Sequence, residues 1–369
     1  MTTRGENAVR KRLRYRPDTE LVIELSWYAI TDVGMRRENN QDSYVLAPPL
    51  FAIADGMGGH TGGEIASGAV VRRLAELEGD QLVTVDDIAN RLIDAVEDIE
   101  LEVGVDGSGA GTTVTGAVFG TDTESPSWTV FNIGDSRVYQ YFKGALSQIT
   151  VDHSVVQHLI DTGAITPEEA EVHPHANVIT RAVGFHEDPV PDAVELALIP
   201  GQRLLICSDG LTKELTDLGI QHFLSQSESA EETAKTLIAQ ALGNAGRDNV
   251  SVIVIDVHAV GEARDTSDLS VPETQQTREA AVAAQLHAPN HPVAEPDLDE
   301  VFIGDERVEH LLAGAEVSAL THVGNAAQET ADTGVDEAET AEENAEADDS
   351  AGDAVDDSAG EATGDASGD

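Results

Sequence analysis

The sequence predicts an α+β fold: a central sandwich of two antiparallel β-sheets flanked by helices, with a disordered acidic tail at the C-terminal end. Strand-like apolar runs are numerous and follow one another through short polar turns. Helical patterns gather into a few blocks instead of alternating with strands, which favours a sandwich over a doubly wound parallel sheet. Beyond residue 257 the apolar patterning stops, and Ala, Asp, Glu, Thr, Gly and Ser dominate.

The first elements are expected within residues 21–103. Residues 21–30 have a strand pattern, and the apolar run 50–54 is a buried strand that ends at Asp55. Residues 64–77 and 85–103 have helical spacing. The apolar positions that fall on one face of each helix are Ile65, Val70, Val71 and Leu74, then Ile88, Leu92, Val96 and Ile99.

Further strands are expected at residues 112–119, 128–133 and 138–142. The turn Gly134-Asp135-Ser136-Arg137 is short enough to join the last two of these as neighbouring antiparallel strands in a hairpin. A helical stretch covers residues 154–161.

The second half of the domain begins with a capped helix start. Thr166 can cap it, Pro167 occupies the first helical position, and two glutamates suit the helix dipole. Residues 173–185 are polar and irregular, and we interpret them as a mobile flap. The last elements are two strands and the helix between them, at residues 203–208, 250–257 and 230–242.

Composition divides the 369 residues into three segments. Residues 1–20 are basic and indicate a disordered arm. Residues 21–257 have enough Val, Ile and Leu for one sizeable core. Residues 258–369 hold 29 Asp and Glu against three Arg, and such a chain cannot bury enough apolar surface to offset its entropy. One island, residues 301–323, has the pattern of a short amphipathic helix, either docking a partner or without function.

The charge and the cysteine count exclude several function classes. A net charge of −48 speaks against nucleic-acid and anionic-membrane partners, because phosphates repel such a surface. No apolar run reaches the roughly 18 residues that a membrane span needs. Cys207 is the single cysteine, so no intrachain disulfide can form. We therefore expect a cytoplasmic protein, and a monomer.

Four aspartates carry the functional signal, because each lies at a strand end or in a turn: Asp55, Asp135, Asp209 and Asp248. A single Asp-Gly is usually only a turn. Clustered carboxylates repel one another unless a cation lies between them, and oxygen ligands select Mg²⁺ or Mn²⁺. Zinc lacks its ligands here, since the chain has neither a Cys cluster nor a His-Glu-x-x-His pattern.

Two such ions, roughly 3.5–4 Å apart, can share a bridging water and lower its pKa to about 7. The resulting hydroxide can attack phosphorus in line. The glycine after Asp55 lets a backbone carbonyl approach a metal without a side chain in the way.

Six sequence motifs in order give the chain a specific resemblance over residues 25–257. It resembles the bacterial form of the type 2C (PPM) metal-dependent protein phosphatases. The motifs are TDVGMRRENNQD (31–42), DGMGGH (55–60), GTT (111–113), NIGDSR (132–137), SDG (208–210) and RDN (247–249).

The resemblance implies a serine/threonine protein phosphatase with a dinuclear centre, opposing bacterial serine/threonine kinases. It implies that Asp55, Asp209 and Asp248 ligate one Mn²⁺ or Mg²⁺, and that Asp55 and the Gly56 carbonyl hold the second. Three more residues take family positions: Asp42 supports the second ion through water, Asp135 joins Asp209 at a third site, and Arg37 binds the phosphate. Arg37, Asp55 and Asp209 are the expected catalytic residues.

Two positions depart from the family pattern. Gln41 stands where many members have glutamate, which removes a negative charge near the second metal. His60 lies away from the family position of a histidine, so it is either a general acid or an ordinary loop histidine, with water protonating the leaving group instead.

Rival interpretations have weaker support. Cys207 closes an apolar strand and has Lys213, not arginine, six positions on, so it indicates a core thiol and not a nucleophile. The chain has no glycine-rich phosphate loop followed by a suitable lysine, so the sequence does not indicate a kinase. A non-catalytic phosphate-binding relative and a phosphatase dedicated to one regulatory protein remain as alternatives. The acidic tail is either a polyanionic decoy for acidic substrates and metal or a solubilising extension.

Overall fold

The computed structural model describes residues 1–58, 61–79, 82–103, 109–121, 125–185 and 188–262, together with the backbone of two short paired strands, β15 (Phe302–Ile303) and β16 (Glu306–Arg307). The chain divides into two units, residues 1–319 and 320–369, and the second lies wholly outside the described residues. Both strands lie in the 301–323 segment, and the residues that carry its predicted helical pattern, from Val308 on, lie outside the described residues. The rest of that segment and of the predicted acidic tail lie outside the described residues.

The first sheet has six strands in the order β1-β4-β5-β8-β9-β12, and all neighbours are antiparallel except β1 and β4. Its strands are β1 (Thr3–Arg4), β4 (Ser43–Ala47), β5 (Leu50–Ala54), β8 (Val114–Phe119), β9 (Ser127–Ile133) and β12 (Asp192–Ala197). Two further short strands, β6 (Gly56–Met57) and β7 (Gly111–Thr112), pair with each other beside it.

The second sheet has six antiparallel strands in the order β11-β10-β13-β14-β3-β2. Its strands are β11 (Ala145–Gln148), β10 (Arg137–Phe142), β13 (Arg203–Cys207), β14 (Val250–Glu262), β3 (Leu21–Asp32) and β2 (Ala8–Arg14). The two sheets pack face to face through buried aromatic rings. Phe51 of the first sheet lies with its ring centroid 5.2 Å from that of Trp27 in the second. The predicted sandwich is confirmed.

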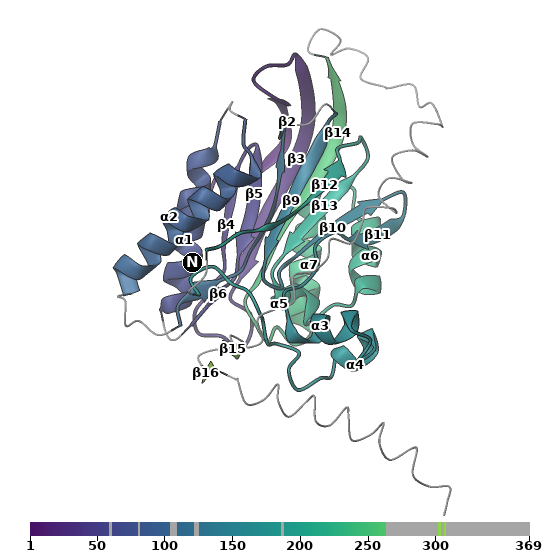
Figure 1. Cartoon of the computed structure of the whole chain (residues 1–369). Coiled ribbons are helices and arrows are strands. Elements are labelled where there is room, and N and C mark those ends of the chain that lie inside the picture. Colours follow the sequence, from purple (N-terminus) through teal and green to yellow (C-terminus); the bar gives the residue numbers. More distant parts are fainter. Residues whose placement is uncertain are drawn as a thin grey trace, which may run out of the picture. The chain divides into compact units, whose positions relative to one another are not determined.

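Helices cover the outer face of each sheet (Figure 1). Helices α1 (Gly62–Leu74) and α2 (Val85–Val103) pack on the first sheet, and α7 (Ala230–Asn244) packs on β3 and β14 of the second. The remaining helices are η1 (Ala75–Leu77), α3 (Val155–Asp161), α4 (Pro167–Ala170), α5 (Asp209–Thr212) and α6 (Asp217–Gln226). No helix in the described part of the chain combines the length and apolar character needed to cross a bilayer.

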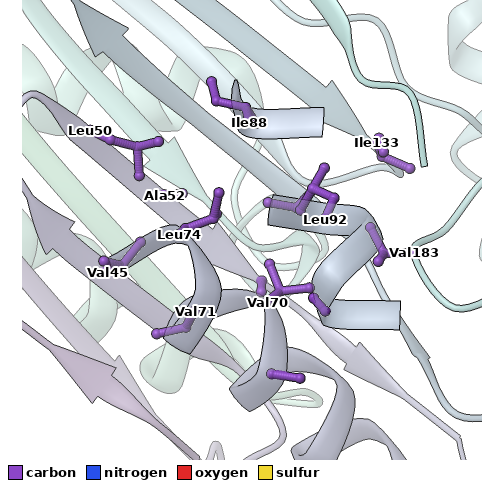
Figure 2. Close-up of a cluster of buried hydrophobic side chains, with 14 of the residues drawn as sticks. Val45, Leu50, Ala52, Val70, Val71, Leu74, Ile88, Leu92, Ile133 and Val183 are labelled. Atoms are coloured by element: carbon purple, nitrogen blue, oxygen red, sulfur yellow. The ribbon is translucent and has the colours of Figure 1, made fainter. Parts of the chain in front are cut away.

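The layer between the first sheet and its helices is a single apolar cluster (Figure 2). Val45 and Leu50 point from the strands toward Val70, Leu74 and other side chains of α1, and Leu92 of α2 completes the contact. This burial explains why the helical pattern at residues 85–103 predicted α2 to the residue, since its apolar stripe has one sheet to cover.

The segment predicted as a flap, residues 173–185, is irregular but attached at two points. Val183 forms a bridge with Thr112, and Ile179 forms one with Ser154. Val183 is fully buried and reaches the same apolar cluster (Figure 2). The predicted cap at Thr166 is confirmed, and the structure adds the reciprocal hydrogen bond of Glu169 that makes it a capping box.

The predicted hairpin at residues 134–137 is wrong. The preceding strand β9 belongs to the first sheet, whereas β10 pairs with β13 and β11 in the second. The turn therefore crosses from one sheet to the other. A short connection fits either arrangement, because the two sheets of a sandwich lie only about 10 Å apart.

The solvated arm expected at residues 1–20 is also wrong. Strand β2 pairs with β3, and β1 extends the first sheet. Without β2, the long strand β3 would expose an edge of unpaired backbone groups. The basic side chains of Arg10 and Arg12 both pair with Glu24 on β3, which is buried. At the other end, β14 runs five residues past the expected boundary at 257, because residues 259–262 also pair with β3.

Substituting Tyr15 with Ala should lower the free energy of unfolding by about 3 kcal/mol, a typical cost for a buried aromatic side chain. Its ring is 4% exposed, and its hydroxyl accepts a hydrogen bond from the Ser127 backbone N–H at 2.9 Å. The control is Val9→Ala in the neighbouring strand, where the side chain is 85% exposed. Urea unfolding should separate the two variants, and equal, negligible losses would favour a solvated arm.

Candidate metal centre

The predicted site aspartates lie at one end of the sandwich and come from both sheets. Asp55 follows β5, and Asp42 directly precedes the antiparallel β4, so both lie at the same end of the first sheet. Asp209 follows β13, and Asp248 precedes the antiparallel β14, so these two share an end of the second sheet. Hydrogen bonds to Asp42 show that the two ends face each other.

Asp42 is fully buried and connects the sheets. Ser208 and Ser251 donate hydroxyl hydrogen bonds to its Oδ2, at 2.9 and 2.6 Å. Ser208 also accepts from the Ser251 backbone N–H. The other oxygen of Asp42, Oδ1, is buried and has no hydrogen-bond partner among the described residues. A buried carboxylate oxygen without a partner is costly, so Asp42 is poised to accept from a group that the protein alone does not supply.

Asp55 is held by its backbone. Its N–H donates to Thr113 Oγ1 at 3.1 Å, and its carbonyl accepts from the Thr113 N–H at 2.9 Å. The next residue, Gly56, has no room for a side chain, because a Cβ would lie 2.1 Å from the Gly63 carbonyl oxygen and 2.7 Å from that of Gln41. The chain after β5 is therefore packed so tightly that only glycine fits beside the candidate ligand.

Asp209 and Asp248 are bridged by Lys213. Its Nζ lies 2.5 Å from Asp209 Oδ2 and 2.8 Å from Asp248 Oδ2. Arg37 binds Asp248 from the solvent side, with Nε 2.9 Å from Oδ1 and Nη2 3.1 Å from Oδ2. Asp209 Oδ1 is buried and, within the part of the chain described, accepts no hydrogen bond.

Asp135 lies in the turn that crosses between the sheets. The preceding Gly134 donates its N–H to His153 Nδ1 at 3.0 Å, and the following Ser136 shares a hydrogen bond with Thr113, beside Asp55. The turn that sequence reasoning assigned to a hairpin thus brings Asp135 toward the other aspartates.

The carboxylates of the site are buried close to one another, with too few cationic side chains beside them, among the described residues, to balance their negative charges. Burial raises the pKa of Asp42 to about 6, and the charges of Asp209 and Asp248 add to the effect. Burial, with Asp209 next, raises the pKa of Asp135 to about 8. The pKa of Asp55 is raised well above its usual value by burial and by Asp42, Asp209 and Asp248. For Asp248, burial acts in the same direction, but Lys213 and Arg37 hold its pKa below the usual range.

The donor set fits hard divalent cations. All the candidate ligands are oxygens, and two of the carboxylates have a buried oxygen with nothing bound to it among the residues described. Within those same residues, no three His, Cys, Asp or Glu side chains stand together in ready-made ligand positions. In this arrangement two cationic side chains, Lys213 and Arg37, hold Asp248.

Several site residues were missed by the sequence interpretation. Lys213 was considered only as a mismatch to a cysteine-phosphatase pattern. Its spacing of four from Asp209 across a short helix is the signal that could have found it. Asn249 was seen only as part of a motif, yet its side chain accepts from the Gln41 N–H and donates to the carbonyls of Val33 and Asn39. It therefore ties the loop that carries Arg37 to Asp248.

The remaining predictions have mixed outcomes. Cys207 is fully buried, and burial raises the pKa of its thiol to about 12, so the predicted core thiol is confirmed. Gln41 donates its N–H to Asn249 and its side-chain amide to the Gly58 carbonyl at 3.4 Å. His60 lies outside the described residues, and its role as a general acid stays a prediction.

Comparison with known proteins gives the family. The model of the family described as Protein phosphatase 2C matches residues 36–247. The chain is 37% identical over 278 residues to the serine/threonine protein phosphatase PstP of Mycobacterium tuberculosis, covering 71% of this chain and 53% of that protein. It therefore spans about half the length of that curated relative. It is 31% identical over 250 residues to the serine/threonine phosphatase stp of Listeria innocua, covering 64% of this chain and 98% of that one.

A solved structure agrees with both sequence matches. The crystal structure of the catalytic domain of PstP in complex with two manganese ions superposes with a TM-score of 0.57 at 38% identity. The match covers 63% of this chain and 98% of that one. With the fold, the facing aspartates and the family model in agreement, the chain belongs to the protein phosphatase 2C family.

Proposed function

We propose that the chain is a metal-dependent protein phosphatase that hydrolyses phosphoserine and phosphothreonine. The observation that carries this proposal is that Asp42, Asp55, Asp209 and Asp248 reach the same end of the sandwich from two sheets, with two buried carboxylate oxygens left without partners among the described residues. Burial, together with the charges of Asp209 and Asp248, raises the pKa values of Asp42 and Asp55 there. Family membership supports the same reaction, because the relatives from Mycobacterium tuberculosis and Listeria innocua are named as serine/threonine phosphatases.

Each aspartate has a distinct proposed role. Asp55, Asp209 and Asp248 hold one Mn²⁺ or Mg²⁺, and Asp55 with the Gly56 carbonyl holds the second. Asp135 and Asp209 form a third, weaker site. When bound, such ions supply positive charge to the phosphoryl oxygens and lower the pKa of an attacking water. The raised pKa values of Asp42, Asp55 and Asp135 support these roles, because cations nearby would return these groups to their charged forms.

The chain's own residues orient the other reactants. Asp42, fixed by Ser208 and Ser251, can hold a water against the second site, and its rigidity limits where that water lies. Arg37 lies at the rim with 53% of its side chain exposed, so its guanidinium can turn from Asp248 to two oxygens of a phosphoryl group. Gln41, which is neutral, contributes position and no charge.

The proposed substrates are phosphorylated proteins, including serine/threonine kinases and their targets, and the proposed location is the cytoplasm. The serine/threonine phosphatase names of the relatives support the substrate class. The single buried thiol is compatible with a reducing compartment. Arg181, in the irregular 173–185 segment, donates a hydrogen bond to Asp192, which also shares one with His153. His153 in turn binds the crossing turn, so the segment lies beside that turn. This position supports a part for the segment in substrate choice.

The proposed activity predicts that a phosphothreonine peptide is hydrolysed only when a divalent cation is added. Protein stripped with a chelator should be inactive, and Mn²⁺ should restore turnover, because the site's carboxylates lack that charge without it. Phosphate release measured across a Mn²⁺ titration tests this. Binding of the phosphopeptide without turnover at any Mn²⁺ or Mg²⁺ concentration, by a protein with cooperative unfolding, would favour a phosphate-binding relative instead.

A further inference from the structure

Lys213 is a charged residue of the site that neither the predicted ligand set nor the proposed mechanism uses. It follows α5 directly, and its backbone N–H donates to the Asp209 carbonyl at 2.8 Å, which keeps it in the last turn of that short helix. Four residues after Asp209, its side chain returns over the helix and reaches both Asp209 and Asp248. The ammonium group therefore lies between the two carboxylates that the proposal assigns to one ion.

The oxygens of these carboxylates are largely occupied. Asp248 Oδ2 takes the ammonium of Lys213 at 2.8 Å and Nη2 of Arg37 at 3.1 Å, while Oδ1 takes Arg37 Nε and the Asn249 N–H, both at 2.9 Å. Asp209 Oδ2 lies 2.5 Å from the same ammonium. A divalent ion bound to these Oδ2 atoms would stand within a few ångströms of that ammonium, where like charges repel strongly.

We propose that Lys213 is a built-in competitor of the metal, an internal counterion that offsets part of the negative charge of Asp209 and Asp248 until a divalent cation displaces it. The proposal rests on the metal site proposed above. Lysine suits the task, because its ammonium is a point charge on a flexible stem and can leave without disturbing the backbone. With 27% of its side chain exposed, Lys213 has a path toward solvent.

Two consequences follow from competition. The metal-free protein is more stable with Lys213 than without it, because removing one partner leaves buried carboxylates uncompensated. Metal binding is weaker with Lys213, because the apparent affinity falls by the fraction of molecules in which the carboxylates are open. If Lys213 only fastened α5 to the start of β14, removing it would weaken metal binding, because Asp209 and Asp248 would be less firmly positioned.

The test is calorimetric titration of Mn²⁺ into chelator-stripped protein at fixed pH and low salt. Lys213→Met keeps the length of the side chain and removes its charge, and Lys213→Gln retains a hydrogen-bond donor should the first variant fold poorly. The matched control is Lys235→Met on α7, where Lys235 makes an exposed pair with Glu231 at the same spacing of four, 2.6 Å apart. Thermal unfolding with and without Mn²⁺ gives a second readout.

We expect Mn²⁺ to bind the Lys213 variants on the order of 10-fold more tightly than it binds wild type. This is the factor that applies if the carboxylates are free of Lys213 in about a tenth of the wild-type molecules. The rise in thermal midpoint on adding Mn²⁺ should be larger for them than for wild type. Lys235→Met should match wild type. Equal or weaker Mn²⁺ binding by folded Lys213 variants would overturn the counterion role while leaving the metal site intact. No binding by wild type, with Asp209→Asn indistinguishable from it, would overturn the metal site and this proposal together.

Discussion

Replacing Asp209 with Asn should abolish most phosphothreonine peptide turnover at a Mn²⁺ concentration that saturates wild type. Asp209 is the proposed ligand shared between two ion positions, and its Oδ1 is buried without a partner in the described part of the chain. Loss of a group that merely orients a metal ligand typically costs 10–100-fold, and loss of a direct ligand should exceed about 100-fold. Steady-state phosphate release measures the loss.

The matched control for this variant is Asp161→Asn at the exposed end of α3, where the side chain accepts a hydrogen bond from Gln157 that asparagine can still accept. Its turnover should equal that of wild type. Circular dichroism should show the same cooperative unfolding for both variants, so that lost activity is not lost fold. Turnover by Asp209→Asn within a few-fold of wild type would remove Asp209 from the metal centre.

Replacing Gly210 with Ala should lower the free energy of unfolding by about 3 kcal/mol, at the upper end of the usual cost of overpacking a core. A Cβ at this position would lie 1.9 Å from the Asn249 carbonyl oxygen and 2.9 Å from its carbon. Both are backbone atoms, so the clash cannot be relieved by a rotamer change. Asn249 also holds the loop of Arg37, and its displacement should weaken Mn²⁺ binding as well.

Gly243→Ala provides the control for backbone effects. Gly243 lies in α7, and a Cβ there would meet nothing within 4 Å. Alanine in a helix is favoured over glycine by roughly 1 kcal/mol, so this variant should be slightly stabilised and should bind Mn²⁺ like wild type. Urea unfolding of the pair checks both signs. If Gly210→Ala is as stable as Gly243→Ala, the backbone of α5 does not lie in close contact with the residues that precede β14.

The elements with a strong local pattern could be predicted from sequence. Helix α2 has an apolar stripe of Ile88, Leu92 and Ile99 against acidic residues, and its bounds were predicted to the residue. Strand β5 is a fully buried apolar run ended by Asp55, which a sequence pattern also captures. Where the burial of one face decides the secondary structure, the spacing of apolar residues along the sequence is enough to predict it.

The crossing turn at residues 134–137 could not be predicted in the same way. Strands β9 and β10 both carry apolar side chains and are joined by a short turn, which fits a hairpin and a sheet-to-sheet crossing equally well. The choice is made by distant partners, β8 and β12 on one side and β13 on the other. For residues 1–20 the decisive feature was likewise distant, because the edge of β3 and the buried Glu24 stabilise a strand whose own composition is polar.

Some residues of the candidate site likewise have a local sequence signal, whereas others depend on contacts between distant parts of the chain. Asp55, Asp209 and Asp248 can be selected from the sequence because each follows or precedes an apolar strand, and in the structure antiparallel pairing brings such positions to one end of a sheet. Ser208 and Ser251 could not be assigned to Asp42 without knowing that the second sheet faces the first at this end. Lys213 looks like an ordinary solvent-facing lysine until β14 brings Asp248 beside Asp209.

We propose that these aspartates from two sheets form one divalent-metal centre. Crystals grown with Mn²⁺ and measured at the manganese absorption edge test it most directly. We expect two anomalous peaks, one among Asp55, Asp209 and Asp248 and one beside Asp55 and the Gly56 carbonyl, with the Lys213 ammonium moved off both carboxylates. Peaks only elsewhere would rule out this metal centre, whereas peaks at both positions with Lys213 still bridging Asp209 and Asp248 would rule out the counterion role alone.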